Sequence, residues 1–194
     1  MNQERLDRLF EYKDTIYDDI SIDKQKILED IYKDPDIFEV LNNKELLDKC
    51  APPEDYYMVN IFPFLKIPGT QSKVQNYLCF EINDTQDIER NNAFIVKQVV
   101  FRTASHEEDV QTPYGICRQD LLALLIKERF QWSNVLGLQL KVTYDSGKIA
   151  ENGYYYRQIV FTQTMVNSLQ ESQMKNRLDG LGRDYYLRKQ STVF

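Results

Sequence analysis

The strongest constraint on the fold is a change in hydrophobic period near residue 57. Before that point apolar residues such as Ile27 and Ile31 recur at helical spacing. After it, apolar and polar residues alternate, as around Leu78 and Phe80, which is typical of strands with one buried face. Residues 50–55 separate the two patterns and contain paired prolines, which end helices. The chain therefore predicts helices followed by a sheet.

The predicted elements after residue 57 form an α+β fold, in which a mainly antiparallel sheet is packed by one central amphipathic helix. The strands are expected at 58–67, 76–82, 94–103, 138–144 and 154–164. Pro63 places the first of them at a sheet edge. The helix is expected from residue 116 to about 132. The turn before it contains Thr112 and Pro113 as candidates for the N-cap and the first helical residue, and Gly137 closes the segment.

Charge divides the 194 residues into three parts. Residues 1–55 carry 8 Lys or Arg and 16 Asp or Glu, whereas the segment 164–194 carries 5 and 3. We predict an acidic helical N-terminal extension at 1–55, an α+β core at 56–165 and a C-terminal extension at 166–194 that neighbouring subunits order. An acidic chain disfavours tight binding to phosphates, and ends of opposite sign favour contact between two copies.

The residue types argue against a cofactor or metal. Motifs that cradle phosphate and the HExxH zinc motif do not occur, and His106 is the single histidine. The three cysteines, Cys50, Cys79 and Cys117, lie far apart in the sequence and are expected to be small buried or semi-buried residues of an intracellular chain. No secretory signal or membrane span is expected. An enzyme with a carboxylate site built from Asp120, Glu128 or His106 stays an alternative, as does an acidic adaptor for a host protein.

The tyrosines 154–156 lie in the last predicted strand, so two of them share one face. Tyr and Arg are enriched where proteins meet, and Arg157 follows directly. Tyr154, Tyr156 and Arg157 are therefore predicted to contact another subunit. The alternative is that the tyrosines rim an ordinary core.

Four short stretches in this order of elements resemble the tail terminator and related neck proteins of long-tailed bacteriophages. They are VVFR at 99–102, YGICRQDLL at 114–122, FQWSN at 130–134 and YYYRQIVF at 154–161. The resemblance covers roughly residues 57–165. It implies a non-enzymatic virion protein, assembled in the host cytoplasm, that forms a hexameric ring ending the tail tube and joining it to the neck.

The resemblance implies three kinds of partner: further copies of the chain, the tail tube and neck or connector proteins, and DNA as non-specific cargo in the channel. Head-closure or connector adaptor proteins of the same neck are the alternative. Two sets of residues complete the expected sites. Subunit contacts are predicted for Arg183, Tyr185, Tyr186 and Arg188. An acidic loop facing the channel is predicted for Glu107, Glu108 and Asp109, which could instead keep the loop soluble.

Overall fold

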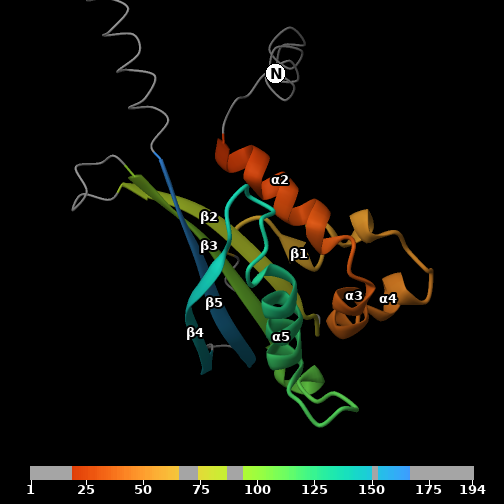
Figure 1. Ribbon diagram of the computed structural model, residues 1–194. Helices are drawn as coiled ribbons and strands as arrows, with labels where there is room; N and C mark the ends of the chain where they lie inside the picture. Colours follow the sequence, from red (N-terminus) through yellow and green to blue (C-terminus); the bar gives the residue numbers. More distant parts are fainter. Residues whose placement is uncertain (1–18, 66–73, 87–93, 150–152, 167–194) are drawn as a thin grey trace, which may run out of the picture. The chain divides into compact units, whose positions relative to one another are not determined.

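The computed structural model describes residues 19–65, 74–86, 94–149 and 153–166 (Figure 1). The expected α+β fold is confirmed. The helical elements are α2 (Asp19–Ile31), α3 (Pro35–Leu41), α4 (Lys44–Leu47), η1 (Pro53–Tyr56), η3 (Glu107–Asp109) and α5 (Arg118–Phe130). The strands are β1 (Ile61–Phe62), β2 (Tyr77–Gln86), β3 (Phe94–His106), β4 (Lys141–Ile149) and β5 (Tyr154–Val166).

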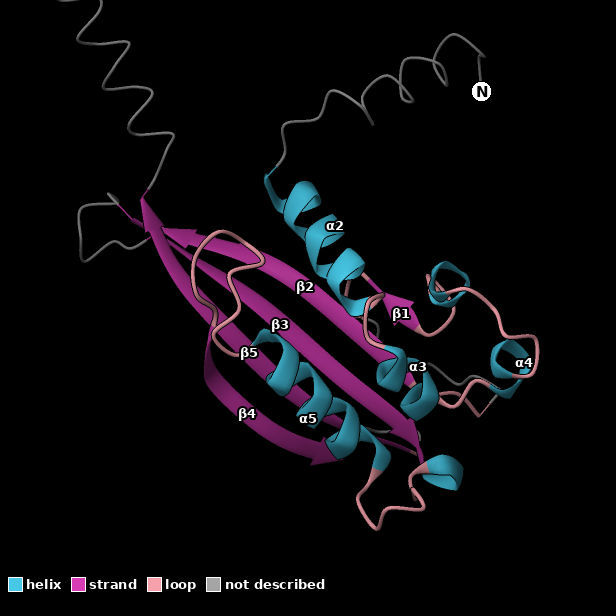
Figure 2. Ribbon diagram, turned by 45° about the vertical axis from the view of Figure 1, so that its right-hand side comes forward, coloured by secondary structure: helices cyan, strands magenta, loops and turns pink. Residues whose placement is uncertain are grey.

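The strands form one sheet in the order β1-β2-β3-β5-β4. β1 runs parallel to β2, and β5 pairs antiparallel with β4 (Figure 2). The predicted edge strand at 58–67 is indeed at an edge, but it has only two residues. Pro63 follows it directly and has no N–H group to extend the ladder.

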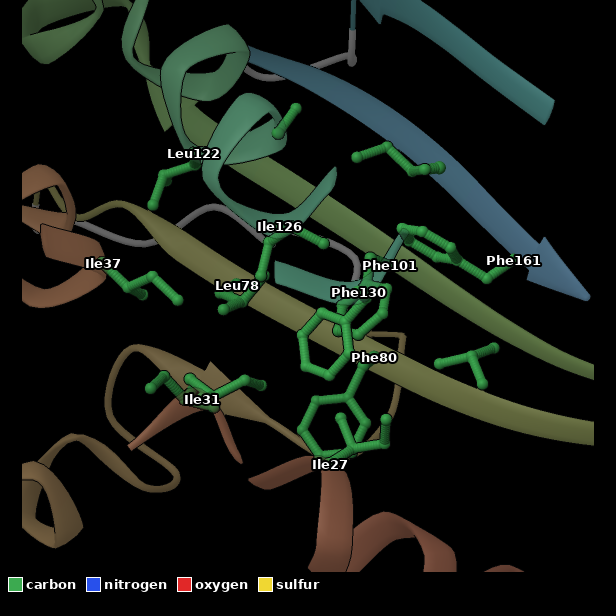
Figure 3. Close-up of a cluster of buried hydrophobic side chains, with 14 of the residues drawn as sticks. Ile27, Ile31, Ile37, Leu78, Phe80, Phe101, Leu122, Ile126, Phe130 and Phe161 are labelled. Carbon is green, nitrogen blue, oxygen red and sulfur yellow. The ribbon is translucent and has the colours of Figure 1, made fainter. Parts of the chain in front are cut away.

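The main core lies between the sheet and α2, α3 and α5, which all cover the same face (Figure 2). Phe101 is at its centre (Figure 3). The centroid of its ring lies 5.0 Å from that of Phe130, 5.7 Å from that of Phe161 and 6.1 Å from that of Phe80. Helix α2 contributes Ile27 and α3 contributes Ile37 (Figure 3), so the helices before residue 57 supply part of this core. Residues 6–17, whose apolar residues also recur at helical spacing, lie outside the described residues.

The ends of α3 and α5 follow local hydrogen bonding. Asp34 caps α3 by accepting the N–H of Asp36, and Asn42 ends it in the left-handed conformation. The start predicted for α5 is wrong. The hydroxyl of Thr112 donates to the carbonyl of Ile116 at 2.6 Å and closes a separate turn, so the helix begins after Cys117.

The end of α5 lies two residues before the expected position near 132. The helix stops at Phe130 with Gln131 as its C-cap. Trp132 then takes a positive φ of 66°. Gly137, which was expected to close the helix, lies in the following loop with a φ of 94°.

A β-bulge changes which face β4 presents. Val142 pairs with Phe161, whereas Tyr144 pairs with Val160, so two steps on β4 match one step on β5. Tyr144 consequently lies on the face opposite the buried Phe161 and is 42% exposed. The alternation predicted for residues 138–144 therefore fails at its end, and Leu138 is exposed before the strand begins.

The chain divides into two compact units. The first comprises residues 1–83 and 98–163, and the second comprises 84–97 and 164–194. In the second unit Lys97 forms an ion pair with Asp84, with a distance of 3.8 Å between Nζ and Oδ2. The predicted division into an N-terminal extension, a core and a C-terminal extension, with boundaries at residues 55 and 165, stays a prediction. Among the described residues, no helix combines the length and apolar character needed to cross a membrane.

Candidate interaction surface

The sheet face opposite the helices carries a second, smaller cluster of buried residues: Phe62, Tyr77, Cys79, Ala104 and Tyr154. Tyr154 is only 2% exposed. Its ring lies 5.9 Å from that of Tyr77 and 5.0 Å from the imidazole of His106. The contact predicted between Tyr154 and another subunit is therefore wrong, because the ring packs within its own chain.

Beside this cluster, the same face presents aromatic and polar side chains that are partly accessible. We call it the open face and define it by Arg102, Tyr144, Tyr156, Gln158 and Val160. The guanidinium of Arg102 lies 5.0 Å from the centre of the Tyr156 ring and donates to Gln158 at 2.9 Å. No helix of the described part of the chain packs on this face. Such a mixture of Tyr and Arg is typical of protein interfaces.

The open face ends at a free sheet edge. β4 is the last strand in the order, and nine residues of its backbone have β5 on one side only, as far as the described residues extend. Trp132 is 55% exposed near this edge, with the Nζ of Lys141 5.4 Å from its ring centre. Together with Leu124 and Val142 it lines a shallow depression between α5 and β4.

Arg157 lies on the helix-covered face, away from Tyr156. Its Nε and Nη2 donate to the Asp145 carboxylate at 2.6 and 2.7 Å, and Nη1 donates to Asp120 at 3.1 Å. These hydrogen bonds, with a further one from Lys127, hold the pKa of Asp145 below its usual range despite partial burial. They likewise raise the pKa of Arg157. The structure thus places Arg157 on the face opposite Tyr154 and Tyr156, with which the sequence grouped it.

The residues of the alternative carboxylate site are not brought together. Asp120 and Glu128 are eight positions apart on α5, about 12 Å along the helix axis. Asp120 is paired with Arg157, and the Nδ1 of His106 accepts the N–H of Glu108. No cluster of three His, Cys, Asp or Glu side chains suited to a metal occurs in the described ranges.

Asp109 differs from its neighbours in the predicted channel loop. Glu107 and Glu108 are exposed, but the Asp109 carboxylate accepts hydrogen bonds from Asn42, Asn76 and Arg118 at 2.7–3.1 Å. It joins α3, β2 and the start of α5 beside a hollow of about 450 Å³. Its charge is paired with the buried Arg118 and is therefore not a free surface charge, and the assignment of the loop to a channel stays a prediction.

Sequence reasoning missed this network because its asparagines are far apart in the chain. Asn60 accepts from Asn43 and donates to the backbone of Asn76, and Asn76 in turn donates to the carbonyl of Leu41. The available signal was a set of asparagines next to predicted helix and strand ends, where amides commonly satisfy free backbone groups.

The remaining predicted sites have mixed outcomes. Cys79 is buried as expected, whereas Cys50 and Cys117 are exposed, so the prediction of burial is wrong for these two. The C-terminal contact residues Arg183, Tyr185, Tyr186 and Arg188 lie outside the described residues, and the assignment stays a prediction.

One family model, YomW, matches residues 34–163. The matched region begins at the N-cap of α3 and ends within β5, so it contains the sheet and α5. No curated protein and no solved structure matches the chain.

Proposed function

The chain belongs to the YomW family, which indicates a phage origin, and from this origin and the open sheet we propose that it is a structural protein of the virion. It assembles into a hexameric ring at the head-to-tail junction, where it ends the tail tube and connects it to the neck around the DNA channel. Its partners are further copies of itself and the tail tube and neck proteins. The resemblance of stretches in the sheet and α5 to tail terminator and neck proteins supports a place at the head-to-tail junction.

The observation that carries the proposal is the free edge of β4 beside the open face. As far as the described residues extend, the outer side of this nine-residue edge strand pairs with no other strand, and only the N–H of Val142 donates to a side chain, that of Gln131. Such an edge invites another chain. Tyr144 and Trp132 expose large apolar surface next to it, and the buried Nε atom of the partly accessible Arg102 has no hydrogen-bond partner among the described residues. This combination supports an assembly surface better than a substrate site.

The experiment compares two tyrosine variants of the full chain. Tyr144→Lys puts a charge beside the β4 edge, whereas Tyr114→Lys places the same charge on an even more exposed tyrosine in the loop before α5. Light scattering and negative-stain microscopy are done with and without the tail tube protein of the same phage. We expect rings for the native chain and Tyr114→Lys, and loss of rings for Tyr144→Lys.

Two outcomes would overturn the proposal. A native chain that stays monomeric at all concentrations, alone and with the tube protein, would exclude a ring. A particle structure containing a single copy of this chain would exclude it as well.

A further inference from the structure

An apolar groove lies among α3, α4 and η1, outside the open face. It has a volume of about 370 Å³, at the lower end of the usual range for ligand pockets. Its lining is Tyr32, Pro35, Phe38, Leu46, Leu47, Cys50, Ala51, Pro53 and Tyr56. The rings of Phe38 and Tyr56 pack with centroids 4.8 Å apart, and two prolines stiffen the walls. The groove is therefore a preformed site for apolar side chains.

The surroundings of the groove are negative. Residues 33–55 contain seven Asp or Glu and three Lys. Asp36, Asp48, Glu54 and Asp55 are all exposed. Burial raises the pKa of Tyr32 in the groove wall to about 12, and the negative charge of Glu54 adds to this effect. An occupant should therefore combine apolar side chains with positive charge.

We propose that this groove binds residues 177–194 of a second copy of the chain, an inference that rests on the proposed role in assembly. This segment, RLDGLGRDYYLRKQSTVF, contains four basic and two acidic residues. Tyr185, Tyr186 and Leu187 are consecutive within it, next to Arg188. It thus supplies aromatic side chains that fit the apolar groove and basic side chains that complement the acidic residues around it.

The length of the chain permits this contact. Val166 ends β5, and 28 residues follow it. Fully extended, residues 167–177 could span about 36 Å and all 28 residues about 90 Å, so residues 177–194 have the length to reach a neighbouring copy. Because the acidic groove and the basic segment belong to one chain, each copy offers both halves of the contact, and the same contact can repeat from copy to copy.

The groove provides its own chemical probe, since Cys50 lines it and is exposed. In the full chain carrying Tyr186→Cys, mild oxidation should form a disulfide between Cys50 of one copy and the new cysteine of another. Non-reducing gels would show covalent oligomers, and mass spectrometry would identify the linked peptides. Adding Cys50→Ser should abolish the product, whereas adding Cys117→Ser, which removes the other exposed thiol, should leave it unchanged.

A second measurement tests recognition by charge. Fluorescence anisotropy follows a labelled peptide of residues 177–194 as the full chain is added at low and physiological salt. We expect saturable binding that weakens with salt. The double variant Glu54→Lys, Asp55→Lys should lower affinity about tenfold, because exposed charge pairs are individually weak but two are reversed. The control Glu107→Lys, Glu108→Lys reverses another exposed acidic pair and should stay within about twofold of native affinity.

The outcomes separate this inference from the proposed function. A cross-link that forms equally in the Cys50→Ser variant, a link within one copy, or a peptide that does not bind would overturn the groove assignment. If rings still form, the virion role stands without it. Conversely, peptide binding by a chain that never forms rings would support the groove contact and contradict the ring.

Discussion

Asp109 shows how one carboxylate can hold several elements together. It lies in an acidic triplet that reads as a solvated loop, yet its two oxygens bind Asn42, Asn76 and Arg118. Arg118 is only 7% exposed and also donates to the carbonyl of Val40. A buried guanidinium needs its carboxylate, because an unpaired charge in this environment is costly.

We predict that Asp109→Ala lowers the free energy of unfolding by about 2–4 kcal/mol, since it leaves the buried Arg118 charge without its carboxylate and removes one of the two acceptors of the Asn76 amide. Urea denaturation followed by circular dichroism measures this change. Glu108→Ala, at the adjacent exposed position, should change stability by less than about 0.5 kcal/mol. Equal effects of the two substitutions would contradict the proposed role of the network.

A second residue-scale prediction concerns pH. The folded-state pKa of Asp145 is lowered mainly by hydrogen bonds from Arg157, and also by Lys127. Its ionised form therefore stabilises the fold above the unfolded-state pKa of about 4, and this contribution is lost as pH falls through the lower folded-state pKa. Between pH 6 and pH 2, urea unfolding should show a larger loss of stability for the native chain than for Asp145→Asn. Glu128→Gln, a control on the exposed side of α5, should follow the native chain.

The sequence could predict which residue types belong to an interface but not which faces they occupy. Tyr154 and Arg157 are close in sequence, yet Tyr154 is buried on the sheet face opposite the helices, whereas Arg157 forms an ion pair with Asp120 of α5 on the other face. Their environments depend on Tyr77, Asp120 and Asp145, which are distant in the chain. Local pattern carries no information about such partners.

At the scale of elements, α2 behaves as part of the core. Ile27 and Ile31 are fully buried against the sheet. The sequence predicted this helix and its apolar face correctly from periodicity. It could not predict that the face packs on the same sheet as α5, since helical spacing defines a face but not its partner.

We predict that Ile31→Ala destabilises the whole fold by about 2–5 kcal/mol, as expected for a large-to-small change in a packed core. Ile22→Ala, at a 38% exposed isoleucine of the same helix, should cost less than about 0.5 kcal/mol. Thermal and urea unfolding should each remain a single transition. If Ile31→Ala instead lost helical signal in an early separate step, while its main transition stayed at the native midpoint, α2 would fold independently of the sheet.

Element boundaries were predicted least well where backbone geometry departs from the regular pattern. Apolar residues recur at helical spacing from Ile37 to Leu47, but they form two helices, α3 and α4, which separate at the left-handed Asn42. β4 contains a bulge that transfers Tyr144 to the open face. Both events depend on single residues whose conformation the hydrophobic period does not specify.

For the whole molecule, the formal charge of -6 predicts weak contact with DNA. We expect duplex DNA to bind with a dissociation constant above about 1 µM at physiological salt, in the range of non-specific binding, and more weakly as salt rises. Fluorescence anisotropy at several salt concentrations measures this. The double variant Glu107→Lys, Glu108→Lys should bind more tightly. Submicromolar affinity of the native chain would contradict its role as a conduit for DNA.

The two edges of the sheet differ in how much backbone they offer for pairing with another chain. β1 offers two residues before a proline, whereas β4 offers nine. If identical β4 edges paired with each other, both would be saturated and growth would stop at two copies. An assembly of higher order therefore needs a second, unlike contact on every copy, and it closes only when the rotation between these contacts divides a full turn.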